Sequence, residues 1–130
     1  AYYLFAEAIS NNKPINVFNN GEMERDFTYI DDIVRGVTKI IEKNIEYREH
    51  YKIYNIGNNK TESLQNFIAT IEELLNKKAV RQMLPMQAGD VPKTFADVNG
   101  IIKDYNYAPT TEIKTGLLNF INWFQAYKNI

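Results

Sequence analysis

The chain contains no cysteine at any of its 130 positions, which excludes disulfide frameworks, thiolate nucleophiles and cysteine-based zinc sites. An excess of one charge is also missing, because 15 Lys and Arg residues balance 16 Asp and Glu residues. Such a balance gives no broad field for nucleic acid or a membrane surface. No signal-peptide pattern opens the chain, and no apolar run reaches the roughly 18 residues of a membrane span. We therefore expect a soluble, cytoplasmic protein that binds neither nucleic acid nor membrane.

Motifs of catalysis are scarce as well. None of the six glycines pairs at the G-x-G spacing, so the turn that cradles a dinucleotide phosphate is absent. No Tyr has a Lys four residues later, which excludes a Tyr-x-x-x-Lys acid/base pair. The single histidine, His50, lies in a polar stretch, where a solvated loop residue is favoured over a metal ligand, since a metal site needs several ligands. We expect no catalytic, cofactor-binding or metal-binding residue in this chain.

Two adjacent carboxylates, Asp31 and Asp32, resemble an acid/base pair. Consecutive helical residues point about 100° apart, however, so these side chains do not face each other. Their place in the first turn of a predicted helix favours capping and interaction with the helix dipole.

What the chain does contain is a hydrophobic fraction of 45%, with nine Tyr and seven Phe. This composition is typical of a globular protein, and the length suits one domain. The apolar periodicities predict a mixed α/β fold with short strands, in a single domain spanning residues 1–130. The helices are predicted at 1–10, 30–41, 64–75, 97–104 and from 111 to about 127, and the strands at 15–18, 51–56 and 79–84, with residues 27–29 extended and a turn at 19–21.

The predicted helix ends rest on capping residues. Ser63, Asp97 and Thr111 each precede a helical pattern, as N-caps do. The first helix, in contrast, begins at Ala1 with neither a cap nor an initiator Met. We therefore expect the chain to be a fragment of a longer protein.

Residues 17–27 are the first candidate for a ligand site. Arg25 lies between acidic residues in extended backbone, and its planar guanidinium suits a phosphate group. Phe18 and Phe27 could supply apolar faces for a planar base. The alternative is a surface ion pair of Arg25 with Asp26 or Glu24, and the spacing alone leaves both interpretations open.

Residues 87–92 are the second candidate. Gly89 permits a turn there, and the carboxylate of Asp90 could accept hydrogen bonds from a vicinal diol such as a ribose. An Asx-turn in an ordinary loop explains the same residues. Without further information, the ordinary turn is favoured.

Three blocks of sequence nevertheless resemble a known family. They are residues 14–33, residues 54–58 and residues 84–97, in that order. Together they closely resemble the nucleotide-sugar epimerases and dehydratases of the extended short-chain dehydrogenase/reductase class, and most of all the UDP-glucuronate 4-epimerase branch. The resemblance spans essentially the whole chain but matches only the C-terminal, substrate-binding part of a family member, without its Rossmann dinucleotide domain.

The resemblance implies that the intact parent binds NAD and epimerises a UDP-sugar at C4. In the family, a hydride leaves the sugar carbon to give a keto intermediate and returns to the opposite face, with a Tyr as base. That Tyr and the NAD site lie upstream in relatives, so the fragment alone is expected to be inactive. A dehydratase, a decarboxylase or a non-catalytic nucleotide-sugar-binding or scaffold domain remain alternatives. The implied partners are the UDP-sugar, the missing Rossmann domain and, in a homodimer, a second copy of the parent.

Carried over by position, the resemblance implies a half-site for the UDP part of the substrate. Arg25 matches a pyrophosphate-binding arginine, and Asp90 matches a residue that holds the ribose hydroxyls. Phe27 matches a position near the nucleotide that is often Tyr. Gln87 stands where some relatives reach the phosphates with Arg, so its neutral amide is a weaker phosphate ligand.

Asn16, Val17 and Phe18 match the segment that frames the uracil in relatives. The helix at 30–41 and the strand at 54–56 match elements that pack near or into the Rossmann sheet. If so, the isolated fragment exposes apolar surface and an unpaired strand edge, which favours self-association.

Overall fold

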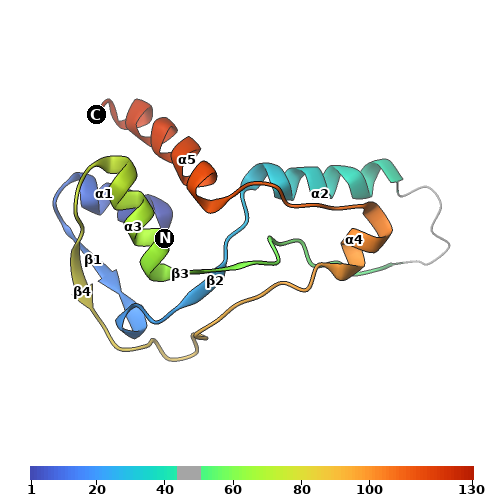
Figure 1. Ribbon diagram of the computed structural model, residues 1–130, viewed down its shortest axis with the longest axis horizontal. Coiled ribbons are helices and arrows are strands. Elements are labelled where there is room, and N and C mark those ends of the chain that lie inside the picture. Colours follow the sequence, from blue (N-terminus) through green and yellow to red (C-terminus); the bar gives the residue numbers. More distant parts are fainter. Residues whose placement is uncertain (44–50) are drawn as a thin grey trace.

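The computed structural model describes residues 1–43 and 51–130. Helices and short strands alternate along an elongated molecule (Figure 1), which confirms the mixed α/β prediction. The elements are α1 (Tyr2–Ser10), β1 (Pro14–Val17), the 3-10 turn η1 (Phe18–Gly21), β2 (Glu24–Asp26), α2 (Ile30–Lys43), β3 (Thr61–Ser63), α3 (Leu64–Leu75), β4 (Val80–Met83), α4 (Asn99–Tyr105) and α5 (Ile113–Lys128). His50 lies outside the described residues, so its predicted loop position stays a prediction.

Two small sheets link distant parts of the chain. Strands β1 and β4 are parallel, with Ile15 opposite Arg81. Strands β2 and β3 are antiparallel, with Arg25 opposite Glu62. Since the second strand of each pair follows the first by tens of residues, both sheets are made by long-range contacts.

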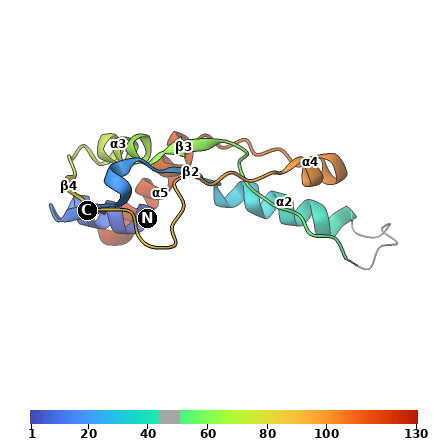
Figure 2. The same ribbon diagram turned by 90° about the horizontal axis from the view of Figure 1, so that it is seen from below.

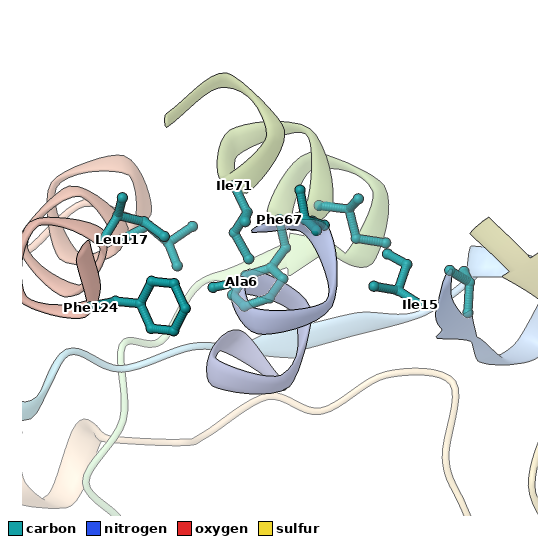
Figure 3. Close-up of a cluster of buried hydrophobic side chains, with 10 residues drawn as sticks. Ala6, Ile15, Phe67, Ile71, Leu117 and Phe124 are labelled. Atoms are coloured by element: carbon teal, nitrogen blue, oxygen red, sulfur yellow. The ribbon is translucent and has the colours of Figure 1, made fainter. Parts of the chain in front are cut away.

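The main hydrophobic core lies where α1, α3 and α5 meet β1. Figure 3 shows side chains of these elements pointing toward one another, among them Ala6, Phe67 and Phe124. The apolar faces predicted for the helices explain this core, because each buries one stripe of side chains. The buried members are Ala6, Ile9, Ile15, Val17, Phe67, Ile68, Ile71, Leu117, Ile121 and Phe124.

A second, smaller core lies at the other end of the molecule, where α2 and α4 pack together (Figure 2). Its buried members are Val98, Ile101, Tyr105 and Tyr107. Tyr107 also donates a hydrogen bond from its hydroxyl to the carbonyl of Gly57 at 2.8 Å. This bond ties the C-terminal half of the chain to the loop that follows residues 51–56.

Several local predictions are confirmed. Ser63 accepts a hydrogen bond from the backbone N–H of Asn66 at 3.1 Å and so caps α3. Asn19, Asn20 and Gly21 all have positive φ, at 51°, 50° and 83°. These are the left-handed conformations that Asn and Gly tolerate, so the turn forms where the sequence predicts it.

The strand predicted at 51–56 is wrong. Its alternation is real, because Tyr51 and Ile53 are exposed whereas Tyr54 and Ile56 pack against the smaller core. A strand also needs a neighbour to bond with, and no strand of the described residues pairs with this segment. Residues 27–29, predicted to be extended, connect β2 to α2, and the strand itself lies just before them, where the backbone meets β3.

Two predicted caps differ from the structure. Helix α5 begins after Glu112 rather than after Thr111, whose N–H instead donates to Asp32 at 3.0 Å. Helix α4 begins at Asn99 after Val98, one residue later than a cap at Asp97 predicts. Asp97 still accepts the N–H of Asn99 at 3.0 Å, so it satisfies one of the N-terminal donors of α4.

Helix α2 leaves much of its predicted apolar face in solvent. Ile30, Val34, Val37 and Ile41 are all exposed, although the spacing places them together on one side of the helix. The exposed stripe matches the expected uncovered surface. Whether it packs near a Rossmann sheet stays a prediction.

Candidate nucleotide-binding site

Arg25 and Asp90 are brought together by the fold although 65 residues separate them. The terminal Nη2 of Arg25 lies 2.8 Å from Oδ1 of Asp90, in a charge-assisted hydrogen bond. The side chain of Arg25 is 24% exposed and that of Asp90 is 33% exposed. The pair is therefore held in place by the protein and remains open to solvent on one side.

Backbone pairing beside β2 explains this contact. The N–H of Glu24 donates to the carbonyl of Pro92 at 2.8 Å, and the N–H of Thr94 donates to the carbonyl of Glu24 at 3.2 Å. Residues 92–94 thus run alongside β2 on the edge opposite β3, as an isolated parallel bridge between Glu24 and Lys93. This alignment carries Asp90 to the guanidinium of Arg25.

The alternative interpretation, a surface ion pair of Arg25 with Asp26 or Glu24, is wrong, because Arg25 pairs with neither carboxylate. Arg25 contacts Glu24 only through the backbone carbonyl, which accepts from Nη1 at 2.9 Å. The carboxylate of Glu24 instead pairs with Lys93 at 2.7 Å, and this hydrogen bond holds the pKa of Glu24 below its usual value. Asp26 is fully engaged elsewhere.

Asp26 joins three segments and was not singled out by the sequence. Its carboxylate accepts from the N–H groups of Asn58 at 2.9 Å, Asn59 at 3.1 Å and Ala96 at 3.0 Å. Asp26 therefore fixes the loop after residues 51–56 and the segment after Asp90 against β2. The only sequence signal for this role was an acidic residue next to Arg25.

The residues predicted to frame the base lie on β1 and at the start of η1. Asn16 is exposed, Phe18 is half-buried, and the side chain of Val17 is completely buried in the main core. Val17 can therefore meet a ligand only through its backbone, and its carbonyl already accepts from the N–H of Leu84 at 2.9 Å.

The connection that carries Gln87 and Asp90 passes close to η1. The N–H of Asn20 donates to the carbonyl of Leu84 at 3.1 Å, and the chain then runs from β4 below η1 toward β2 (Figure 1). Gln87 is exposed, and its carbonyl accepts from the N–H of Asp90 at 3.2 Å. The expected turn exists, with Gly89 at a φ of 82°. The connection that carries Gln87 and Asp90 thus begins beside the turn that follows the predicted base residues.

Phe27 belongs to a different surface. Its ring stacks on Phe67 with centroids 4.4 Å apart and an interplanar angle of 8°. It lines an apolar cleft of about 470 Å³ together with Tyr29 and Trp123. None of the other predicted site residues lines this cleft, so Phe27 faces a surface that they do not share.

The comparisons with known proteins agree with the resemblance. The model of the NAD dependent epimerase/dehydratase family matches residues 2–57. An uncharacterised protein of Methanocaldococcus jannaschii is 46% identical over 99% of this chain and 38% of its own length. UDP-glucuronate 4-epimerase 6 of Arabidopsis thaliana is 35% identical over 100% of this chain and 31% of its own length.

A solved structure gives the same result. The crystal structure of a UDP-glucuronic acid 4-epimerase mutant from Bacillus cereus, in complex with UDP-4-deoxy-4-fluoro-glucuronic acid and NAD, superposes with a TM-score of 0.88 and 27% identity. The alignment covers 98% of this chain and 40% of that chain. The resemblance to the NAD-dependent epimerase/dehydratase family is confirmed. The chain spans about two-fifths or less of the length of these relatives.

Two further findings concern the residues of this chain that the structure describes, 1–43 and 51–130. No helix there has both the length and the apolar character needed to cross a membrane. No three His, Asp or Glu side chains in those ranges come together in an arrangement that could hold a metal ion.

Proposed function

We propose that the chain binds the UDP part of a nucleotide sugar and serves an NAD-dependent epimerase that interconverts UDP-glucuronate and UDP-galacturonate at C4. The observation that carries this proposal is the 2.8 Å contact between Arg25 and Asp90. This contact supports the proposal, because the residues expected to bind the diphosphate and the ribose are neighbours and are both partly exposed. The names of the Arabidopsis and Bacillus cereus relatives support the choice of sugar.

In this proposal each residue has a chemical task. The guanidinium of Arg25 binds the diphosphate through charge-assisted hydrogen bonds. The carboxylate of Asp90 accepts from the ribose hydroxyls, and Asn16, the backbone of Val17 and Phe18 frame the uracil. Gln87 contributes a neutral contact near the phosphates. Phe27 acts from the neighbouring cleft, where it supports the segment after β2.

The described residues do not fit NAD itself. Of the six glycines, Gly21 and Gly89 have positive φ, and neither opens a helix. The Gly-rich strand-to-helix turn that binds dinucleotide phosphates is thus not formed by this part of the chain. We propose that NAD and the catalytic Tyr and Lys belong to a separate Rossmann domain, and that residues 1–130 act as one substrate-binding unit.

The test has a binding arm and a catalytic arm. Calorimetry should detect binding of UDP to the chain, and binding of UMP should be weaker because one phosphate is missing. The natural gene product that contains the chain should interconvert UDP-glucuronate and UDP-galacturonate when NAD is present. Absence of UDP binding would overturn the proposal.

The catalytic arm separates the alternatives. Loss of water or of carbon dioxide from the sugar would identify a dehydratase or a decarboxylase. Binding of UDP without turnover of any UDP-hexose would identify a non-catalytic nucleotide-sugar-binding domain. This alternative is supported by the sequence of residues 1–130, which contains neither a G-x-G nor a Tyr-x-x-x-Lys motif.

A further inference from the structure

The two carboxylate oxygens of Asp90 have different surroundings. Oδ1 accepts from Nη2 of Arg25 at 2.8 Å and from the N–H of Val91 at 2.9 Å. Among the described residues, none donates a hydrogen bond to Oδ2. The N–H of Val91 and the guanidinium of Arg25 fix the carboxylate of Asp90 through Oδ1, and Oδ2 remains for a ligand.

The guanidinium of Arg25 is also divided between the protein and solvent. Nη1 donates to the carbonyls of Glu24 at 2.9 Å and Pro92 at 3.2 Å, and Nη2 donates to Asp90. These bonds use three of the five N–H groups of an arginine. Two carbonyls and a carboxylate therefore set the plane of the guanidinium, and two N–H groups are left for an anion.

From this geometry we infer that Asp90 is a positioning residue for Arg25: it holds the guanidinium in the orientation that receives a diphosphate, while its other oxygen faces the ribose. The inference rests on the proposed nucleotide-sugar site and extends it. The ribose contact and the diphosphate contact share one carboxylate, so they depend on each other. Such a site selects nucleoside diphosphates over either half of the ligand alone.

The two possible roles of Asp90, binding the ribose only or positioning Arg25, predict opposite effects on a ligand that has no ribose. The negative charge of Asp90 repels a nearby phosphate. If Asp90 only held the ribose, removal of the carboxylate would leave the binding of inorganic pyrophosphate unchanged or make it tighter. If Asp90 positions Arg25, the same removal weakens pyrophosphate binding. The sign of the change therefore distinguishes the two roles.

The experiment measures the dissociation constants of UDP, uridine and inorganic pyrophosphate by calorimetry, on the full chain and on Asp90→Ala and Asp90→Asn. Asp90→Ala should weaken pyrophosphate binding by about three- to tenfold, the effect of a partly exposed hydrogen bond to a charged group. Asp90→Asn should recover part of this loss, because an amide oxygen can still accept from Arg25. Uridine binding should weaken in both variants.

The matched control is Glu73→Gln. Glu73 forms an exposed ion pair with Lys114 at 2.7 Å, outside the site, so this variant should bind all three ligands as the unaltered chain does. Unchanged or tighter pyrophosphate binding in Asp90→Ala, with UDP still bound, would overturn the inference and leave the proposed function standing. Failure of the unaltered chain to bind UDP would overturn both.

A ligand-free measurement tests the positioning directly. In nitrogen-detected NMR, a fixed guanidinium shows hindered rotation of its terminal NH₂ groups. The Nη2 group of Arg25 should show hindered rotation in the unaltered chain and in Glu73→Gln, and faster rotation in Asp90→Ala, where only the bonds of Nη1 to the carbonyls of Glu24 and Pro92 remain. Equal rotation in all three chains would overturn the inference whether or not a nucleotide binds.

Discussion

Oδ2 of Asp32, at the start of α2, accepts the backbone N–H of Thr111, just before α5, at 3.0 Å. Oδ1 accepts from the N–H of Thr110 at 3.2 Å and pairs with Arg35 at 2.8 Å. The side chain is 1% exposed. Burial alone would raise the pKa of Asp32, but the N–H groups of Thr110 and Thr111 and the charge of Arg35 outweigh burial and hold the pKa below its usual value.

Replacement of Asp32 should therefore destabilise the chain. Asp32→Ala leaves the part-buried N–H groups of Thr110 and Thr111 without this acceptor and removes the partner of Arg35, so we expect the free energy of unfolding to fall by about 1–3 kcal/mol. The neighbouring Asp31 is exposed and serves as the control; Asp31→Ala should change the free energy of unfolding by no more than about 0.5 kcal/mol. Urea titrations measure both, and equal losses in the two variants would contradict the assigned role of Asp32.

Glu72 on α3 makes stability depend on pH. Burial would raise the pKa of this carboxyl, but the N–H of Ala79, at 2.9 Å, and the Arg81 guanidinium, at 3.3 Å, outweigh burial, so the pKa lies below the usual 4.5. A carboxyl with a lowered pKa stabilises the folded state above its unfolded pKa. The stabilisation is lost as the pH falls through the lower folded value.

We therefore expect the chain to be less stable at pH 3 than at pH 6. Glu72→Gln has no carboxyl to titrate at this position, so its free energy of unfolding should fall less over the same range. Urea titrations at pH 6, 5, 4 and 3 measure both chains, with the exposed Glu73→Gln as the control. A constant difference between the unaltered chain and Glu72→Gln across this range would contradict the assignment.

Gly57 is required where the loop after residues 51–56 meets the segment after Asp90. A Cβ at this position would lie 2.4 Å from Cβ of Ala96 and 3.2 Å from Oδ2 of Asp26. Gly57→Ala should thus separate the segments that Asp26 joins and cost about 1–3 kcal/mol of unfolding free energy. Thermal unfolding followed by circular dichroism measures the loss.

Gly100 in α4 provides the control for Gly57. A Cβ there would meet Tyr54 at an ordinary 3.6 Å, and Ala favours a helix over Gly by up to about 1 kcal/mol. Gly100→Ala should leave the unfolding temperature unchanged or raise it. A similar fall in both variants would show that the close approach at Gly57 is not the cause.

The sequence predictions that depend on neighbouring residues are confirmed, whereas several that depend on contacts between distant residues are wrong. The cap at Ser63 and the turn at 19–21 depend on neighbouring residues, and both are confirmed. The strand at 51–56 has the right alternation but lacks a paired neighbour among the described residues, which no local pattern reveals. Thr111 has the chemistry of a cap, yet its N–H is drawn to a buried carboxylate 79 positions away.

The site shows the same division. Arg25 and Asp90 were each singled out as candidates, but their contact depends on the bridge between Glu24 and Lys93, which joins segments far apart in the sequence. Asp26 had no distinguishing pattern, because its three backbone partners come from two distant loops. The sequence therefore predicts which residues have the chemistry to bind a ligand, but it does not predict which residues they contact in the fold.

Arg25 gives the most direct test of the nucleotide site. Removal of its side chain deletes the charged donor that we propose for the diphosphate, so Arg25→Ala should weaken UDP binding by about 1.5–3 kcal/mol, the range for a hydrogen bond to a charged group. Arg25→Lys keeps the charge but loses the planar fork, so its affinity should lie between those of the unaltered chain and Arg25→Ala. Calorimetry with UDP measures all three.

The control for charge alone is Lys114→Ala, which removes an exposed cation on α5 that pairs with Glu73. UDP affinity should be unchanged in this variant, because Lys114 lies outside the proposed site. Circular dichroism establishes that Arg25→Ala retains its fold, which we expect because Asp26 still joins β2 to both neighbouring segments. A folded Arg25→Ala chain that binds UDP as tightly as the unaltered chain would show that the diphosphate does not bind at Arg25.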